Sequence, residues 1–168
     1  MLVSTKTPFS LYICAWEPDL AREVYEVSRQ LIASGTVPLH IPYLPEYGEF
    51  DWQATRTLID RADAYIIMTG EQYGTLSPTG ESYLHREVSY ILARNRPVAS
   101  FMRNTAALAK NLEEARRLVS MQNQLKQGYH KFWSGREELL IHVRAGWTHL
   151  YRLLSAAAPS STGYCAEY

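Results

Sequence analysis

Residues 63–98 read DAYIIMTGEQYGTLSPTGESYLHREVSYILARNRPV. The apolar run at 65–68 is bounded by Asp63 and Gly70, which predicts a short strand buried on both faces, as in a parallel sheet. The glycine-rich loop after this strand must pass its carboxyl end, where open α/β sheets bind ligands. Ser82 is a suitable N-cap for a following helix. That helix has an apolar stripe at helical spacing, made of Leu84, Val88, Ile91 and Leu92.

Glu87 is an acidic residue at the edge of this core-facing stripe. It lies three residues after Leu84 and four before Ile91, so its side chain borders the core rather than the solvated back of the helix. A helix N-terminus favours the ionised form of such a carboxyl group. Two interpretations stay open: Glu87 serves a site at the end of the strand, or it is an edge carboxylate paired with Arg86, Arg94 or another nearby basic residue.

Composition and charge indicate a globular protein and disfavour two classes of partner. The chain has 168 residues with 46% hydrophobic and 20% charged side chains, which suits a single domain with a substantial core. Seventeen basic and seventeen acidic residues give a formal net charge of zero. We therefore expect neither nucleic acid nor an anionic membrane as a partner.

Cysteine usage and the N-terminal sequence favour a cytoplasmic location. Two cysteines, Cys14 and Cys165, are too few for a disulfide framework, and the N-terminus lacks the basic and apolar pattern of a signal peptide. No apolar run approaches the ~18 residues that a membrane span needs. We expect two free thiols and a buried structural role for Cys14.

Short apolar runs alternate with helical stripes along the chain, which predicts an α/β fold with a mostly parallel sheet of about five strands. The strands are expected at residues 11–15, 37–44, 65–68, 97–102 and 129–133. Two prolines in the second of these would each remove a ladder hydrogen bond, so that strand is expected at an edge. Ser134 and Glu137 fit a capping box that opens the last helix. We expect one domain over residues 1–155 and a flexible tail over 156–168.

Common nucleotide and metal motifs are missing from the sequence. No G-x-G-x-x-G loop follows the first strand and no Walker loop is present, which disfavours a standard dinucleotide fold and a P-loop NTPase. The five histidines fit no zinc spacing. His85-Arg86-Glu87 is similar to the H-x-E of zinc deaminases, but its P-C-x-x-C partner is missing. We therefore predict neither a metal nor a bound cofactor.

Three blocks of the sequence share their order and spacing with one family. They are LYICAWEPDLARE at residues 11–23, DAYIIMTGEQYG at 63–74 with GESY and RPV beyond it, and KFWS at 131–134. Together they resemble the bacterial Domain of Unknown Function 4062 family over most of residues 10–154. The first block departs from the family pattern at Cys14-Ala15-Trp16, which replaces small hydroxylic residues.

The resemblance implies both a fold and an activity. That family is similar to TIR domains and nucleoside deoxyribosyltransferases, which share a flavodoxin-like, three-layer α/β/α fold. In both groups a glutamate near the start of the helix after a central strand acts on a ribosyl carbon, and Glu87 matches it by position. The implied function is cleavage or transfer of an N-glycosidic bond of NAD or another nucleotide.

The resemblance also carries an alternative from another functional class. Many TIR-like domains are non-catalytic modules that bind a nucleotide or a partner protein and signal by self-association. Twelve tyrosines and four tryptophans leave enough aromatic surface for such an interface. In bacteria both kinds of domain often serve phage defence, so the resemblance implies that setting for either function.

The implied reaction requires an anion beside the ribose. Loss of the base passes through an oxocarbenium-like state, which a carboxylate such as that of Glu87 can stabilise electrostatically or attack as a nucleophile. The expected ligand-binding residues surround the end of the central strand and the start of its helix. They are Asp19, Thr69, Gly70, Glu71, Tyr73, Ser82 and Tyr83.

Several of these residues have a structural alternative beside their ligand role. Tyr73 and Tyr83 offer rings on which a base can stack, whereas Thr69 and Ser82 offer hydroxyls for ribose. Tyr73 is equally suited to a core position, and Asp19 to a helix cap. The segment EQYG can also be a simple turn.

Overall fold

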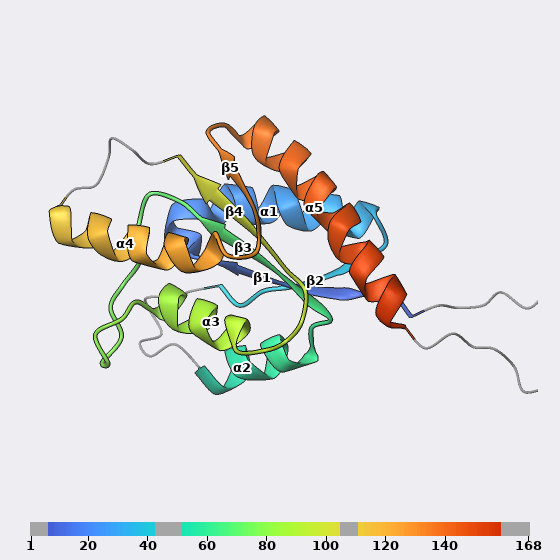
Figure 1. Ribbon diagram of the computed structural model, residues 1–168, viewed down its shortest axis with the longest axis horizontal. Helices are drawn as coiled ribbons and strands as arrows, with labels where there is room; N and C mark the ends of the chain where they lie inside the picture. Colours follow the sequence, from blue (N-terminus) through green and yellow to red (C-terminus); the bar gives the residue numbers. More distant parts are fainter. Residues whose placement is uncertain (1–6, 43–51, 105–110, 159–168) are drawn as a thin grey trace, which may run out of the picture.

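The computed structural model describes residues 7–42, 52–104 and 111–158. Strands and helices alternate along the described chain (Figure 1). In order they are β1 (Ser10–Ala15), α1 (Glu17–Ala33), β2 (Val37–Leu39), α2 (Trp52–Arg61), β3 (Ala64–Thr69), α3 (Tyr83–Leu92), β4 (Val98–Arg103), α4 (Leu112–Leu125), β5 (Tyr129–Trp133) and α5 (Arg136–Ala157).

The five strands form one parallel sheet in the order β2-β1-β3-β4-β5. This is the flavodoxin-like order, in which the chain direction across the sheet reverses between β1 and β3. The two strands are in register from Leu11 opposite Ala64 to Ala15 opposite Met68. The predicted flavodoxin-like α/β fold with a parallel sheet is thus confirmed.

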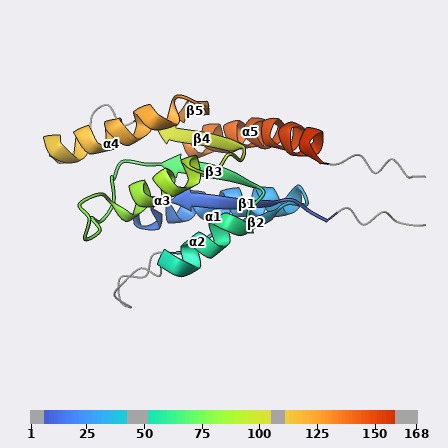
Figure 2. The same ribbon diagram turned by 60° about the horizontal axis from the view of Figure 1, so that its bottom comes forward.

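Helices cover both faces of the sheet and make a three-layer structure (Figures 1 and 2). Along β1 the side chains alternate, so that Leu11 and Ile13 pack with α1 and α5, whereas Tyr12 and Cys14 pack with α2, α3 and α4. Both sets are fully buried. This double burial explains why the central strands are continuous apolar runs in the sequence.

The second strand lies at an edge of the sheet, as its prolines predict. It is shorter than the expected strand at 37–44: only Val37–Leu39 form β2 within the described residues. Residues 43–44 of the predicted strand lie outside the described residues.

The last helix differs from its prediction at both ends. Its N-cap is Gly135, and the backbone N–H of Ser134 donates to Glu138 Oε2 at 2.8 Å, so the carboxylate that closes the cap is one residue later than Glu137. The helix continues to Ala157, two residues into the expected tail. Residue 158 precedes a proline, which disfavours a helical conformation there. Residues 159–168 of the tail lie outside the described residues.

Within residues 7–42, 52–104 and 111–158, none of the helices is both long and apolar enough to cross a membrane. In the same ranges, no three His, Cys, Asp or Glu side chains are grouped so that they could hold a metal ion.

Gly146 of α5 provides a test of how the helix packs on the sheet. A Cβ at this position would lie 2.6 Å from Cζ of the fully buried Phe101. We expect Gly146→Ala to lower the free energy of unfolding by about 1–3 kcal/mol, although alanine favours helix by about 1 kcal/mol. Urea denaturation measures the change.

The Phe101→Leu background is the control for this prediction, because leucine has no atom at the Cζ position. There the Gly146→Ala change should cost much less, and a double-mutant cycle quantifies the coupling. Equal costs in both backgrounds would contradict the proposed contact.

Candidate functional site

Glu87 lies on the buried face of α3 and contacts the central sheet. The helix begins where the sequence predicts, because Ser82 Oγ accepts a hydrogen bond from the backbone N–H of His85 at 3.1 Å. Five residues after this cap, Glu87 is 7% exposed and lies beside the apolar residues that face β1 and β3. Its position on α3 therefore takes the carboxyl group out of water.

The hydroxyl of Tyr12 is the hydrogen-bond donor to this carboxyl group. Tyr12 belongs to β1, is fully buried, and donates from its Oη to Glu87 Oε1. Sequence reasoning missed Tyr12, since a tyrosine in an apolar strand looks like an ordinary core residue. The available signal is the alternation of side chains along the strand. Tyr12 and Cys14 are two residues apart, so their side chains lie on the same face of the sheet, which α3 covers.

The alternative interpretation, in which Glu87 pairs with a neighbouring arginine, is wrong. The guanidinium of Arg86 lies 4.5 Å from the ring centroid of Trp52. Arg94 Nε lies 3.3 Å from Asp60 Oδ1. Within the described part of the chain, neither arginine forms an ion pair with Glu87.

Burial raises the pKa of Glu87 from 4.5 to about 8, against a smaller lowering by the Tyr12 hydrogen bond. The neutral form of Glu87 is therefore favoured overall, whatever the helix N-terminus contributes to the ionised form. Glu87 is the fifth residue of α3, and the helix dipole acts within the first turn, so desolvation outweighs it. Burial also raises the pKa of Tyr12 and of the Cys14 thiol well above their usual values, with the Glu87 charge as a second cause.

Asp19, in the first turn of α1, joins this helix to the loop after β3. Its Oδ2 accepts a hydrogen bond from the backbone N–H of Gln72 at 2.9 Å. A Cβ on Gly70 would lie 2.2 Å from that oxygen, so glycine is needed for the close approach. Burial raises the pKa of Asp19, and hydrogen bonds from the Gln72 and Glu71 backbone oppose the rise. The helix-cap alternative for Asp19 is wrong, because the N-cap of α1 is Trp16 and the Asp19 carboxylate binds the backbone of the loop after β3.

The two predicted hydroxyl ligands already have partners. Thr69 is fully buried, and its Oγ1 accepts from Nε2 of Gln122 at 3.2 Å. The buried Ser82 hydroxyl accepts from the α3 backbone. Glu71 lies at the end of the sheet, where its Oε1 is 3.3 Å from Nη2 of Arg103.

Tyr73 is 4% exposed and packs in the core, as its structural alternative proposed. Its Oη lies 2.7 Å from Nδ1 of His85, and the two rings meet edge to face. The backbone N–H of Tyr73 donates to Glu114 Oε1 at 3.2 Å. Tyr83, the first residue of α3, is half-buried beside the same core cluster.

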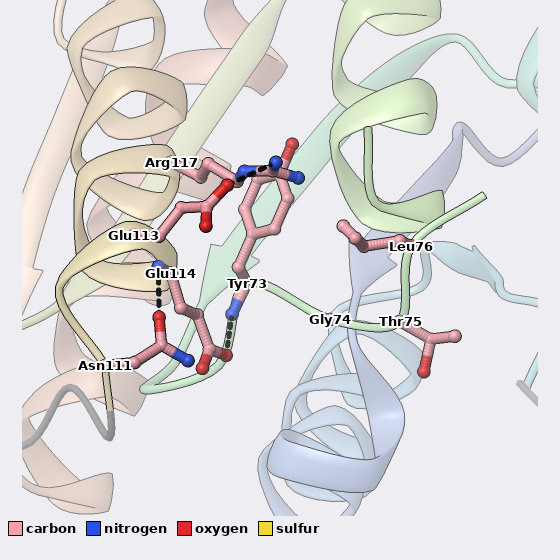
Figure 3. A pocket seen from close by; sticks show the side chains of 8 residues that line it. All are labelled: Tyr73, Gly74, Thr75, Leu76, Asn111, Glu113, Glu114 and Arg117. Carbon is pink, nitrogen blue, oxygen red and sulfur yellow. Dashed lines mark hydrogen bonds and ion pairs between the residues drawn. The ribbon is translucent and has the colours of Figure 1, made fainter. Parts of the chain in front are cut away.

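A pocket of about 370 Å³ opens between the loop after β3 and the start of α4 (Figure 3). Its lining residues are Tyr73, Gly74, Thr75, Leu76, Asn111, Glu113, Glu114 and Arg117. Glu87 does not line it, because its carboxyl group is buried between α3 and β1. The α4 residues were missed from the sequence because they lie about forty positions beyond the loop and belong to no recognised motif.

The structure thus separates the predicted site residues into two groups. Glu87 meets Tyr12 in the buried layer, whereas Tyr73 belongs to the wall of the pocket. Asp19 and Gly70 hold the loop between these two places. A carboxyl group that is buried and whose pKa is strongly raised marks a candidate functional site.

One family matches most of the chain. The family described as "Domain of unknown function (DUF4062)" matches residues 11–148. No curated protein matches the chain.

Solved structures with a similar fold include the CMP N-glycosidase BcmB of Clostridium botulinum. It is 13% identical, covers 80% of this chain and 98% of its own, and has a TM-score of 0.51. The TIR domains of the activated Roq1 resistosome are 13% identical, with 86% and 84% coverage and a TM-score of 0.47. General stress protein 14 of Treponema denticola, in complex with FMN, is 13% identical, with 89% and 99% coverage and a TM-score of 0.40.

The raised pKa of Glu87 predicts how stability depends on pH. Between about pH 4.5 and 8 the folded protein keeps this proton while the unfolded chain loses it, so the free energy of unfolding falls as pH rises. Glu87→Gln removes the titrating group. We expect the stability of Glu87→Gln relative to the parent to increase by on the order of 1 kcal/mol per pH unit in that window.

Urea denaturation at pH 5, 6.5 and 8 measures this difference. Glu26→Gln on α1 is the matched control, because Glu26 is half-buried and its carboxylate forms an ion pair with the neighbouring Arg29. Parallel pH profiles for the parent and Glu87→Gln would rule out a buried neutral carboxyl group at position 87.

The contact between Gly70 and Asp19 predicts a specific loss of stability. Gly70→Ala must displace the Asp19 carboxylate from the Gln72 N–H, which we expect to cost about 1–3 kcal/mol. In an Asp19→Ala background the new methyl group has more room, so the same change should cost less. Thermal unfolding of the four proteins gives the coupling, and strictly additive losses would contradict it.

Proposed function

The chain belongs to the DUF4062 family, and from its fold and its buried Tyr12–Glu87 pair we propose that it cleaves or transfers an N-glycosidic bond of NAD or another nucleotide. The single observation that carries the proposal is the Glu87 carboxyl group, buried on α3 beside the reversal point of the sheet. A CMP N-glycosidase with the same fold supports this class of reaction.

The proposed role of Glu87 is to provide negative charge at the anomeric carbon. Departure of the base leaves an oxocarbenium-like ribose, which an adjacent carboxylate stabilises or attacks. The apolar surroundings that make ionisation costly also strengthen the attraction once the charge exists. The Tyr12 hydroxyl then holds one carboxylate oxygen and leaves the other for the substrate.

Ionisation of Glu87 is a required step in this scheme. With a pKa of about 8, the carboxyl group is mostly protonated at neutral pH. A positively charged base, such as the nicotinamide ring of NAD, would favour the carboxylate by direct attraction. The substrate would thus create the active form of Glu87 as it binds.

The proposed ligand-binding residues lie around the carboxyl ends of β1 and β3. They are Asp19, Thr69, Gly70, Glu71, Tyr73, Ser82 and Tyr83. The existing hydrogen bonds of Asp19 and Ser82 support a role in shaping the loop that a nucleotide would contact. Self-association and a role in phage defence rest on the family resemblance, whereas a cytoplasmic location rests on the two cysteines and the N-terminal sequence.

A second candidate function is favoured by the pocket beside Tyr73. Because Glu87 does not line this pocket, a nucleotide bound there would meet no buried carboxyl group and would not be consumed. The domain would then be a binding module that changes its association with itself or a partner. This function shares the fold but not the chemistry.

The proposed activity is tested by incubating the protein with NAD, CMP and a panel of nucleosides. Release of nicotinamide or free base is followed by chromatography. Glu87→Gln keeps the size of the side chain but has no negative charge, so we expect activity to fall at least about 100-fold. Glu26→Gln, on the opposite layer, should remain within about twofold of the parent.

The pH dependence of kcat/KM distinguishes the charged from the neutral form of Glu87. If the carboxylate is the active form, kcat/KM rises with pH to a plateau above about 8. Tyr12→Phe removes a hydrogen bond that lowers this pKa, so the midpoint should move to higher pH. Equal release by Glu87→Gln would refute the enzymatic role, and thermal stabilisation by a nucleotide without turnover would support the binding module.

A further inference from the structure

Five residues of α2 and of α3 with its C-terminal end form an arginine–aromatic surface. We define it by Trp52, Arg56, Arg86, Tyr90 and Arg94. The guanidinium carbons of Arg56 and Arg86 lie 5.9 Å and 4.5 Å from the Trp52 ring centroid. That of Arg94 lies 3.9 Å from the Tyr90 ring centroid. The two rings meet edge to face at 5.5 Å, which joins both sets into one surface.

Helical spacing explains why these side chains come together. Trp52 and Arg56 are four residues apart on α2, and Arg86, Tyr90 and Arg94 continue at intervals of four along α3 and past its end. Each helix thus presents one row of side chains, and the two rows face each other. All five side chains are half-buried. They are packed against one another while remaining open to solvent.

The surface is positively charged. Asp60 is its acidic neighbour, and it accepts from the Tyr90 hydroxyl at 3.0 Å and pairs with Arg94 at 3.3 Å. Arg56 donates to the neutral side chain of Gln53. Among the described residues, no carboxylate pairs with Arg56 or Arg86. Within the part of the chain that the structure describes, the three arginines of this surface therefore have one carboxylate, that of Asp60, as an ion-pair partner, in a chain with no net charge.

We propose that this arginine–aromatic surface docks an acidic segment of a partner protein. A guanidinium held on an aromatic ring keeps its N–H groups available in a fixed plane, which suits two-point binding of a carboxylate. Because the ring contact already restricts the side chain, less entropy is lost on binding. Tryptophan, tyrosine and arginine are also the residue types that dominate binding energy at protein interfaces.

The packing of the rings favours an acidic protein segment over a nucleic acid. Single-stranded nucleic acids bind by stacking their bases on aromatic faces. Here guanidinium groups lie over both rings, so a base would have to displace an arginine before it could stack. The chain has a formal net charge of zero, so it also lacks the overall electrostatic attraction to phosphates on which polynucleotide binding depends.

The docking surface does not depend on the proposed enzymatic function. Arg86 and Glu87 are adjacent in sequence, but Arg86 packs on Trp52 at the surface, whereas Glu87 is buried against Tyr12. Substitutions at Arg56 or Arg86 can therefore remove charge from the surface without touching the buried pair. Failure of either proposal leaves the other intact.

The test is a fluorescence anisotropy titration with a fluorescein-labelled decaglutamate peptide. We expect saturable binding at low ionic strength that weakens as salt is added. Arg86→Gln and Arg56→Gln should each weaken binding at least about fivefold, and Arg86→Lys should lose part of the affinity while keeping the charge. Thermal unfolding confirms that each variant stays folded.

Arg29 provides the matched control, because its guanidinium lies 5.8 Å from the Tyr25 ring centroid on α1, outside this surface. Arg29→Gln should change the affinity less than about twofold. The proposal is overturned if decaglutamate does not bind saturably, or if Arg29→Gln weakens binding as much as Arg86→Gln. Tighter binding of labelled oligothymidylate with the same arginine dependence would also overturn it, in favour of a nucleic-acid surface.

Discussion

A carboxyl group removed from water is the constraint on which this structure depends. The Tyr12 hydroxyl donates a hydrogen bond to Glu87, and both residues lie in the layer of the apolar core between α3 and β1. Such a group is stable only if it is neutral or well paired. The sheet order places β1 next to β3, and the helix that follows β3 lies over β1, so the topology itself brings the two side chains together. The register of this helix on the sheet then decides whether the carboxyl group has a partner.

The fold was largely predictable because its signals are local. The apolar run Tyr65–Met68 and the N-cap Ser82 can each be recognised from the few residues around them. Both lie where the sequence predicts. The cap of the last helix was misplaced by one residue, because the N-cap is Gly135 and not Ser134, and Glu138 accepts the hydrogen bond from the Ser134 backbone N–H. Local chemistry decides whether an element forms, whereas tertiary packing chooses between adjacent residues.

The site was predicted less completely because its contacts are long-range. Position along the helix identified Glu87, but its partner Tyr12 lies 75 residues away in the sequence. The ionisation of Glu87 depends on burial, which a helix-dipole argument does not include. The pocket wall from α4 has no sequence signal near the loop that it faces. Asp19 illustrates the same limit, since its contact with Gln72 links the first turn of α1 to the loop after β3, and only the reversal of the sheet makes these two segments neighbours.

The complete burial of Cys14 has a practical consequence for following motions of this domain. Its thiol lies under α3, close enough to Glu87 for that charge to raise its pKa, and it is shielded from solvent in the folded state. Alkylating reagents attack the exposed thiolate, so modification at this position has to wait until the helix separates from the sheet. The rate of Cys14 alkylation therefore reports how often the layer that contains Glu87 opens.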